Sequence, residues 1–209
     1  MRTYTLWACL SPQSFGELMK AGTYRFSREE LNVKYGIAAE YCDRMFRWYT
    51  RTAGKFMDIP ENCTYPIWLT PAKDRLLTDE QTAVFLKLDV PEDCVLRCNL
   101  SAWEYRMGCR YIPTSAEDDL AHVQEMEHWG AGSDEALINT HRGNFFPHLR
   151  MKIQNSWNRV FTQLNVASGL IAFTAWELRR EWIEEIRMEV QADSVRDDVQ
   201  ISLNNSSEQ

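Results

Sequence analysis

The chain has 209 residues, of which 44% are hydrophobic, and a formal net charge of −7 at pH 7. This length supports one well-cored domain and is short for two, and the hydrophobic content with eight tryptophans excludes disorder over most of the chain. A stretch of about eighteen apolar residues, the length of a transmembrane helix, does not occur. The opening MRTYTLWACLSPQ is too short in its apolar part for a signal peptide. Six cysteines in such a chain therefore indicate reduced thiols and a cytoplasmic protein.

The negative charge is concentrated in two segments. Residues 116–136 contain seven acids and no lysine or arginine, and residues 181–209 contain eight acids and two arginines. These segments contribute −7 and −6, so the rest of the chain sums to +6. Nucleic-acid binding depends on massed positive charge, which disfavours a general nucleic-acid binder. The two acidic segments are instead suited to docking on a basic protein partner.

The N-terminal third predicts a strand followed by helices. Residues 3–10 alternate as a strand does, and Ser11 then begins a helix that Gly22 ends as a left-handed cap. Residues 27–52 form the longest helical candidate, which opens with a capping box and has Gly36 as a candidate break. Three arginines share one further face of this helix: Arg44, Arg47 and Arg51. A solvated basic stripe is the favoured interpretation of this face, and a phosphate-binding surface is the alternative.

Residues 82–103 carry the clearest strand pattern. Every second residue is apolar over the first half of this stretch: Val84, Leu86, Leu88 and Val90. Pro91 begins turn chemistry, and residues 94–98 alternate again. We therefore expect a strand pair joined by a tight turn, followed by a short helix capped by Asn99 or Ser101.

The second half predicts helices followed by strands. The expected elements are an acidic helix over 116–129, a mobile glycine-rich loop over 130–143, an amphipathic helix over 148–164, and strands over 170–178 and 182–190. The composition then becomes polar without a period, so we expect residues 192–209 to be a disordered tail. Together these elements indicate one α+β domain over residues 1–191, with a mixed or antiparallel sheet as its core and helices flanking it.

Glu177 is the candidate residue for chemistry. It continues the apolar face of the strand expected over 170–178. A carboxylate at that position is either a rim residue paired with Arg179 or Arg180, or a partly buried group with a function, since burial raises the pKa of a carboxyl group. The sequence leaves both interpretations open.

The histidines and cysteines do not form a recognisable metal-binding pattern. His122 and His128 fall on different sides of the expected helix, and no CxxC occurs, so we expect no metal site. The cysteines are best interpreted as small packed hydrophobic residues, with a Cys–His nucleophilic pair left open. The P-loop, GxGxxG, GxSxG and HExxH motifs are absent.

Several short motifs follow one another in a distinctive order. They are YPIW at 65–68, LDVP at 88–91 with VL at 95–96, SW at 156–157 followed by Phe161, and WEL at 176–178. In this order, from Tyr4 to about Val190, the chain resembles the bacterial domain-of-unknown-function family 3841. The resemblance implies a cytoplasmic single-domain protein of bacterial or phage origin and implies no activity.

A second, architectural similarity concerns the first and last expected strands. A short strand, a helix ending in glycine and an extended piece open the chain, and a late strand carries Glu177, as in ADP-ribosyltransferase-like domains. This resemblance implies NAD as the cofactor, with Tyr4 and Thr5 contacting the dinucleotide and Trp7 or Tyr41 forming an aromatic wall. Glu177 would then be the catalytic residue, stabilising an oxocarbenium-like transition state.

Two functional hypotheses follow. One is an ADP-ribosyltransferase-like enzyme that uses a nicotinamide dinucleotide. The other is a non-catalytic protein-interaction module, such as an inhibitor or accessory factor of a host or phage system, that docks through segments 116–136 and 181–209. A nucleic-acid-binding module that uses the arginine face is a third hypothesis, which the overall charge disfavours.

Overall fold

The computed structural model describes residues 2–76 and 82–190. Its elements are β1 (Thr3–Leu10), α1 (Pro12–Ala21), β2 (Thr23–Tyr24), α2 (Arg28–Tyr35), α3 (Ala39–Ala53), β3 (Ile67–Leu69), β4 (Thr82–Pro91), β5 (Leu96–Asn99), α4 (Leu100–Met107), α5 (Ala116–His128), α6 (Asp134–Asn139), α7 (Pro147–Ser156), α8 (Arg159–Thr162), β6 (Ile171–Ala175), β7 (Leu178–Arg179) and β8 (Ile183–Val190). Helices and antiparallel strands are both prominent, which confirms the α+β class. The tail expected over 192–209 lies outside the described residues.

The strands form three antiparallel sheets, in the orders β1-β4-β8, β3-β6-β5 and β2-β7. The apolar face expected for β4 is fully buried: Val84, Leu86, Leu88 and Val90 are each 0% exposed. The expected pairing of β4 with the strand after it is wrong, because β1 and β8 occupy both edges of β4. β5 pairs with β6 in another sheet instead.

The helix boundaries follow from local capping. The Ser11 hydroxyl accepts from the Ser14 backbone N–H at the start of α1, and Gly22 at φ +80° ends the helix, as expected. Ser27 and Glu30 form the expected capping box of α2. Gly36 separates α2 from α3, so the long helical candidate is two helices joined by a 3-10 turn.

The glycine-rich stretch expected to be a mobile loop contains structure. Ser133 caps α6 by accepting from the Ala136 N–H, and a 3-10 turn follows at His141–Asn144. Gly143 is buried, and a Cβ added there would lie 2.0 Å from the carbonyl oxygen of Leu137. The glycine therefore serves close backbone packing rather than mobility.

The amphipathic helix expected over 148–164 is divided into α7 and α8. The Ser156 hydroxyl donates to the Ile153 carbonyl at 2.7 Å, which competes with the continuing helix ladder. The indole Nε1 of Trp157 then donates to the Arg110 carbonyl. The expected apolar stripe is buried on both sides of this break: Leu149, Ile153, Trp157, Val160 and Phe161.

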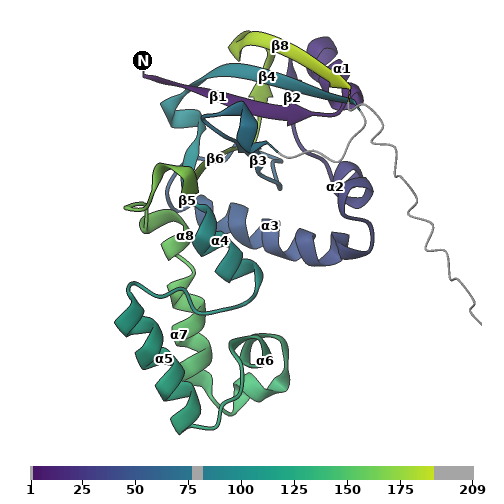
Figure 1. Ribbon diagram of the computed structural model, residues 1–209. Helices are drawn as coiled ribbons and strands as arrows, with labels where there is room; N and C mark the ends of the chain where they lie inside the picture. The colour runs from purple at the N-terminus through teal and green to yellow at the C-terminus, as the bar shows by residue number, and fades with distance from the viewer. Residues whose placement is uncertain (1, 77–81, 191–209) are drawn as a thin grey trace, which may run out of the picture.

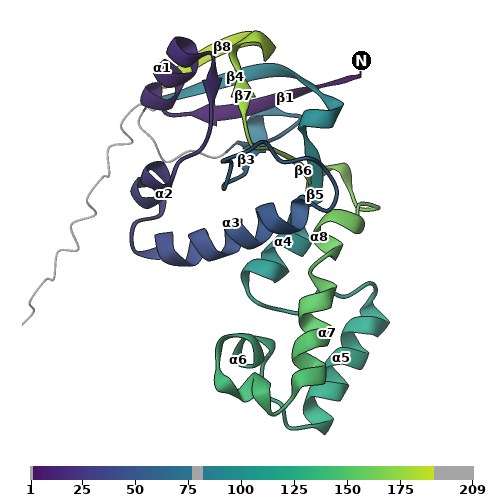
Figure 2. The ribbon, with the colours of Figure 1, turned by 180° about the vertical axis from the view of Figure 1, so that it is seen from behind.

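The described residues form two large hydrophobic cores and one small cluster. The first core contains residues of sheet β1-β4-β8, α1, β3 and β6, and the second is an aromatic core around Tyr49, Trp103 and Trp176. The small cluster contains Trp7, Ala83 and Phe85. Within the second core the guanidinium of Arg106 lies over the rings of Trp48 and Trp157, 4.5 Å and 3.7 Å from their centroids. Helices α5, α6 and α7 form the end of the molecule farthest from sheet β1-β4-β8 (Figures 1 and 2). No helix in the described part of the chain is long and apolar enough to cross a membrane.

Candidate functional site

Glu177 lies between β6 and β7 and is held by two arginines. Oε2 accepts from Arg25 Nε at 2.9 Å and from Nη2 at 2.6 Å, and Oε1 accepts from Arg179 Nε at 3.0 Å. Only 9% of the residue is exposed. The sequence indicated Arg179 as one of two possible partners of Glu177. It did not indicate Arg25, which lies in the segment between β2 and α2.

The two arginines determine the ionisation of Glu177. Burial alone raises the pKa of this carboxyl group, but hydrogen bonds and charge from Arg25 and Arg179 outweigh burial and hold the pKa below its usual value of 4.5. Glu177 is therefore an ionised carboxylate whose negative charge is balanced by ion pairs with Arg25 and Arg179 of the same chain. A group in this state is stabilised as a structural ion pair and is poorly suited to accept a proton.

The first-strand residues expected to bind a cofactor lie on opposite faces of β1. The ring of Tyr4 contacts Phe173 of β6 at 4.9 Å, on the side of the sheet core. Trp7 faces the other way with Ala83, and the Thr5 hydroxyl donates to Asp89 at 2.7 Å on that same side. Only Tyr4 of these three therefore approaches the strand that precedes Glu177.

Tyr41 belongs to the helical core. Its hydroxyl donates to the Met107 carbonyl, and it lies 3.9 Å from Cys109 Sγ. Burial and the nearby Cys109 raise the pKa of Tyr41 to about 12. The structure thus does not gather Tyr41, Trp7 and Glu177 around one site.

The arginine face of α3 is exposed, and part of it is already paired. Arg47 Nε donates to Asp43 at 2.9 Å, and the Arg44 guanidinium lies 5.7 Å from the centroid of the Tyr41 ring. The third member, Arg51, is exposed. This arrangement favours the interpretation of a solvated basic stripe.

A pocket in the described structure lies at the helical end, on the outer side of α5. Its volume is about 660 Å³. It is lined mainly by Asp119, Val123 and Glu127 of α5, by Tyr105, Arg110 and Tyr111 from α4 and the segment after it, and by Ser133 and Asp134 at the start of α6, with His122 and Met126 at its base. We refer to it as the α5 pocket.

One wall of the α5 pocket is a stripe of α5 with two free carboxylates. Asp119, Val123 and Glu127 are spaced at i, i+4 and i+8, so they lie along one face of the helix. Val123 is 45% exposed. Among the described residues, neither Asp119 nor Glu127 has a side-chain hydrogen bond or ion pair, which leaves two carboxylates beside an apolar side chain.

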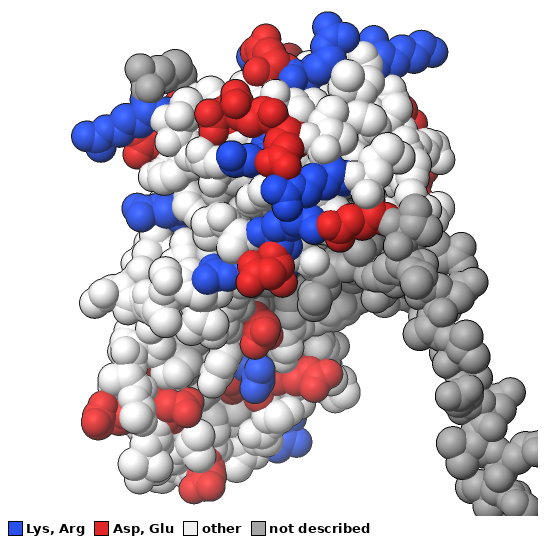
Figure 3. Space-filling view, turned by 45° about the horizontal axis from the view of Figure 1, so that its top comes forward, with Lys and Arg blue, Asp and Glu red and all other residues white. Residues whose placement is uncertain are grey.

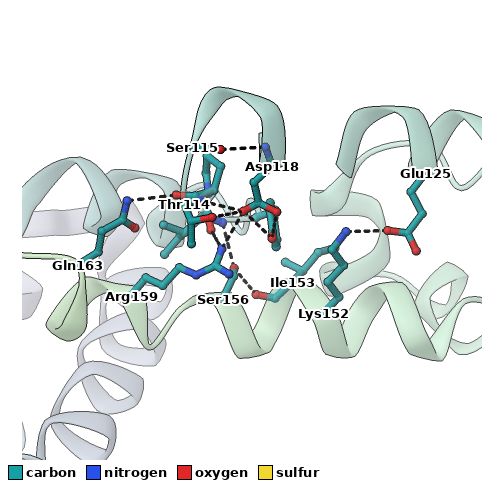
Figure 4. Close-up of polar contacts among 12 residues, drawn as sticks. Thr114, Ser115, Asp118, Glu125, Lys152, Ile153, Ser156, Arg159 and Gln163 are labelled. Atoms are coloured by element: carbon teal, nitrogen blue, oxygen red, sulfur yellow. Dashed lines mark hydrogen bonds and ion pairs between the residues drawn. The ribbon is translucent and has the colours of Figure 1, made fainter. Parts of the chain in front are cut away.

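The inward carboxylates of α5 are fully used in packing (Figure 4). Asp118 accepts from the Tyr111 hydroxyl at 2.9 Å and from the Thr114 N–H at 2.8 Å, and these hydrogen bonds lower the pKa of its carboxyl group. Glu125 accepts from Lys152 of α7 at 2.6 Å. The Glu125 contact joins α5 to α7, and Asp118 also forms an ion pair with Arg159 of α8 at 3.4 Å. These contacts leave the pocket side of the helix free.

A buried histidine and an aspartate form the base of the α5 pocket. His122 Nε2 lies 2.8 Å from Asp134 Oδ1, and the Tyr111 backbone N–H donates to Asp134 Oδ2 at 2.7 Å. The imidazole stacks on the Tyr111 ring, with centroids 4.2 Å apart. The other ring nitrogen of His122, Nδ1, is buried and has no hydrogen-bond partner among the described residues. His122 and Asp134 are 12 residues apart in the chain, and the sequence alone did not indicate that they pair.

The second acidic segment, where it is described, is largely neutralised by its neighbours. Three of its acids form ion pairs: Glu181 with Arg179 at 3.7 Å, Glu185 with Arg187 at 2.6 Å, and Glu189 with Lys73. Acidic and basic side chains lie side by side over this part of the surface (Figure 3). Residues 191–209 of this segment lie outside the residues that the structure describes.

The fold and the pocket define a small α+β protein with antiparallel sheets and an acidic, aromatic-lined pocket at its helical end. A family model for a domain of unknown function, DUF3841, matches residues 5–184, so the chain belongs to that family, as the motif order indicated. No curated protein and no solved structure matches the chain, and the similarity to ADP-ribosyltransferase-like domains gains no support. Among the described residues, no group of three or more His, Cys, Asp or Glu side chains is placed to hold a metal ion.

Proposed function

We propose that this protein is a non-catalytic protein-interaction module that binds a basic segment of a partner through the α5 pocket. The observation that carries the proposal is the pair of free carboxylates, Asp119 and Glu127, on the wall of the α5 pocket. Carboxylates without an internal counter-charge attract a positively charged partner and steer its approach. Of the two acidic segments, residues 116–136 are therefore the docking surface.

Exposed apolar side chains on the same helix support docking rather than simple solvation. Leu120 is 59% exposed and Val123 45% exposed, one turn apart on α5. Trp129, directly after the helix, is 51% exposed. Large apolar side chains beside free charges are typical of surfaces that exclude water when a partner binds.

The alternative, NAD-dependent ADP-ribosyl transfer, has less support. Its catalytic residue, Glu177, is engaged by Arg25 and Arg179. The aromatic residues Trp7 and Tyr41 lie in different parts of the molecule. We therefore favour the interaction module and assign Glu177 a structural role.

We place the protein in the cytoplasm of a bacterium or of a phage-infected cell, as an inhibitor or accessory factor of a host or phage system. No cysteine forms a disulfide in the described part of the chain, and this supports a reducing compartment. A basic partner also fits this setting, because an acidic surface can compete with nucleic acid for a cationic protein.

Charge reversal tests the proposal. The probe is a synthetic peptide of alternating glycine and basic residues, and its affinity is measured by titration calorimetry at low and at moderate salt. We expect the double variant Asp119→Lys/Glu127→Lys to bind the probe at least about tenfold more weakly than the parent. We also expect parent affinity to fall as salt rises.

The matched control reverses two exposed acids elsewhere, Glu29 on α2 and Glu184 on β8. Glu29→Lys/Glu184→Lys changes the net charge by the same amount, so it separates a local site from the overall field. We expect it to weaken probe binding by less than about threefold. Equal weakening by both double variants, or no binding by the parent protein, would refute the proposal.

A further inference from the structure

We propose that two copies of this chain associate through β8, so that their sheets join into one continuous antiparallel sheet. The inference does not depend on the α5 pocket. Among the described strands, β8 pairs with β4 and with no other, so it lies at an edge of its sheet (Figure 1). An edge strand presents a row of unpaired backbone N–H and C=O groups, which a strand of another chain can join.

The apolar face of β8 is left partly uncovered. Ile186 lies opposite Leu86 of β4 in the ladder, and Met188 lies opposite Val84. Directly opposed side chains point to the same face of a sheet. Leu86 and Val84 are 0% exposed, whereas Ile186 is 43% exposed and Met188 64% exposed. The core face is therefore closed over β4 and open over β8, where a further strand would cover apolar surface.

The other face of β8 carries charges of alternating sign. Glu185, Arg187 and Glu189 follow one another on it, and their side chains are between 40% and 50% exposed. Within the chain Arg187 pairs with Glu185 at 2.6 Å, and Glu189 pairs with Lys73. Because a large part of each side chain remains exposed, each can also contact a charge from across the edge of the sheet.

These two faces are complementary to themselves in one antiparallel register. A two-fold axis at Met188 places this side chain beside its own copy on the apolar face. On the charged face the same axis places Arg187 opposite Glu189 of the second copy, and Glu189 opposite Arg187 of the second copy. Both direct pairs therefore join opposite charges, which stabilise an antiparallel pair.

Other registers are less complementary. Since opposed side chains must share a face, the axis can pass only through a residue and not between two residues. An axis at Arg187 opposes two guanidinium groups, and an axis at Glu189 opposes two carboxylates. An axis at Ile186 opposes Met188 with Glu184. The order of charges along β8 therefore fits a second copy of this chain and specifies how it binds.

Association through β8 leaves the α5 pocket free. Helices α5, α6 and α7 form the end of the molecule farthest from sheet β1-β4-β8 (Figures 1 and 2). The dimer therefore presents two α5 pockets away from its interface. Because the interface is built on one strand from each copy, it is small, and we expect a weak and concentration-dependent dimer.

Sedimentation velocity of the full chain, from about 1 μM to about 1 mM, tests the association. We expect a monomer at the lowest concentration and a dimer at the highest. Arg187→Glu opposes carboxylates at both direct pairs, and Glu189→Arg opposes guanidinium groups at both. We expect each variant alone to dimerise at least about tenfold more weakly than the parent.

An equimolar mixture of these two charge variants tests the register. In a mixed dimer the direct pairs again join opposite charges, because Glu at 187 meets Arg at 189 and the unchanged Glu189 meets the unchanged Arg187. We therefore expect the mixture to dimerise about as tightly as the parent. Loss of folding in either variant cannot produce this rescue, so the mixture separates a broken interface from a broken fold.

A pair of lysine substitutions provides a matched control for apolar association. Met188→Lys places two ammonium groups at the two-fold axis, and we expect a monomer at every concentration. Ile37 lies in the 3-10 turn between α2 and α3 and is fully exposed. Ile37→Lys adds the same charge and removes exposed apolar surface outside β8, and we expect it to dimerise as the parent does.

Three results would overturn the proposal. They are a parent chain that stays monomeric throughout, a Met188→Lys variant that dimerises like the parent, and a mixture of charge variants that stays monomeric. Amide hydrogen exchange shows whether another segment of the same chain covers the edge. We expect the β8 amides that point away from β4 to gain protection as the concentration rises, and full protection at the lowest concentration would contradict association between copies.

Discussion

Glu177 and the outer carboxylates of α5 show two ways in which this chain uses negative charge. Glu177 is 9% exposed and is held by two arginines of the same chain, so its charge contributes to the fold. Asp119 and Glu127 line a pocket and have no described counter-charge. Partners within the chain, rather than burial, distinguish a structural carboxylate from one available to a ligand.

The same contrast is present within α5. Asp118 contacts Arg159 of α8 and also Tyr111 and Thr114 of the segment before α5. Glu125 contacts Lys152 of α7. Asp119 and Glu127, on the other side, bind nothing that is described. The helix is therefore fixed by one set of acids and presents another.

We expect the largest loss of stability from a substitution that disturbs the helical end of the molecule and leaves Glu177 untouched. Gly143→Ala places a Cβ 2.0 Å from the Leu137 carbonyl oxygen, so the 3-10 turn and α6 must shift apart. We expect a loss of about 2–4 kcal/mol in the free energy of unfolding, measured by urea denaturation, together with loss of basic-peptide binding.

Gly16→Ala is the matched control for that change. A Cβ at Gly16 meets nothing within 4 Å, and the residue lies inside α1. We expect this variant to be as stable as the parent or up to about 1 kcal/mol more stable. A Gly143→Ala protein of unchanged stability would show that the close contact at Leu137 is relieved without cost.

A smaller loss of stability is expected when the ion pairs of Glu177 are removed. Glu177→Gln removes the negative charge that forms ion pairs with Arg25 and Arg179. The side chains of these two arginines are 44% and 47% exposed, so they can turn toward water. We expect a loss of about 1–2 kcal/mol at pH 7 and unchanged affinity for basic peptides. Unchanged stability with lost peptide binding would reverse the roles assigned to the two regions.

The stability difference between the parent and Glu177→Gln should depend on pH, because the pKa of Glu177 is lowered in the folded state. Because the folded-state pKa lies below the ordinary 4.5, the stabilisation is fully present above pH 4.5 and is lost as the pH falls through the folded-state pKa. The stability gap between the parent and Glu177→Gln should therefore be constant from pH 7 to about pH 5 and narrow below that. Urea denaturation across this range measures it, and a gap that widens in acid would contradict the assignment.

The smallest effect on stability is expected at the pocket. Glu127→Gln removes a carboxylate that has no described partner, so the free energy of unfolding should change by no more than about 0.5 kcal/mol. The same substitution should weaken binding of the basic peptide several-fold, by about 0.5–1 kcal/mol. Destabilisation comparable to that of Glu177→Gln would reveal a structural role for Glu127.

Local features of the fold were readable from the sequence because they depend on neighbouring residues. The caps at Ser11 and Ser27 and the buried face of β4 need only side chains within a few positions. Strand pairing was not readable in this way. β4 has its edges filled by β1 and β8 from the two ends of the chain, so its expected pairing with the next strand could not form.

The candidate site was partly readable for the same reason. The acidity of residues 116–136 is plain in the sequence, and so is the i, i+4, i+8 spacing of Asp119, Val123 and Glu127. Which of these acids are free depends on where α7 and α8 lie, and this is a tertiary property. Likewise Arg179, two residues from Glu177, was anticipated, whereas Arg25, 152 residues away, was not.

The most direct test of the α5 pocket is a titration of the isotopically labelled protein with the basic peptide, followed by amide chemical shifts. We expect the largest shift changes at Asp119–Glu127 and at Ser133 and Asp134, with the amides around Glu177 unmoved. Shift changes that instead cluster around Glu177, Arg25 and Tyr4 would show that the peptide binds beside the late strand and not in the α5 pocket.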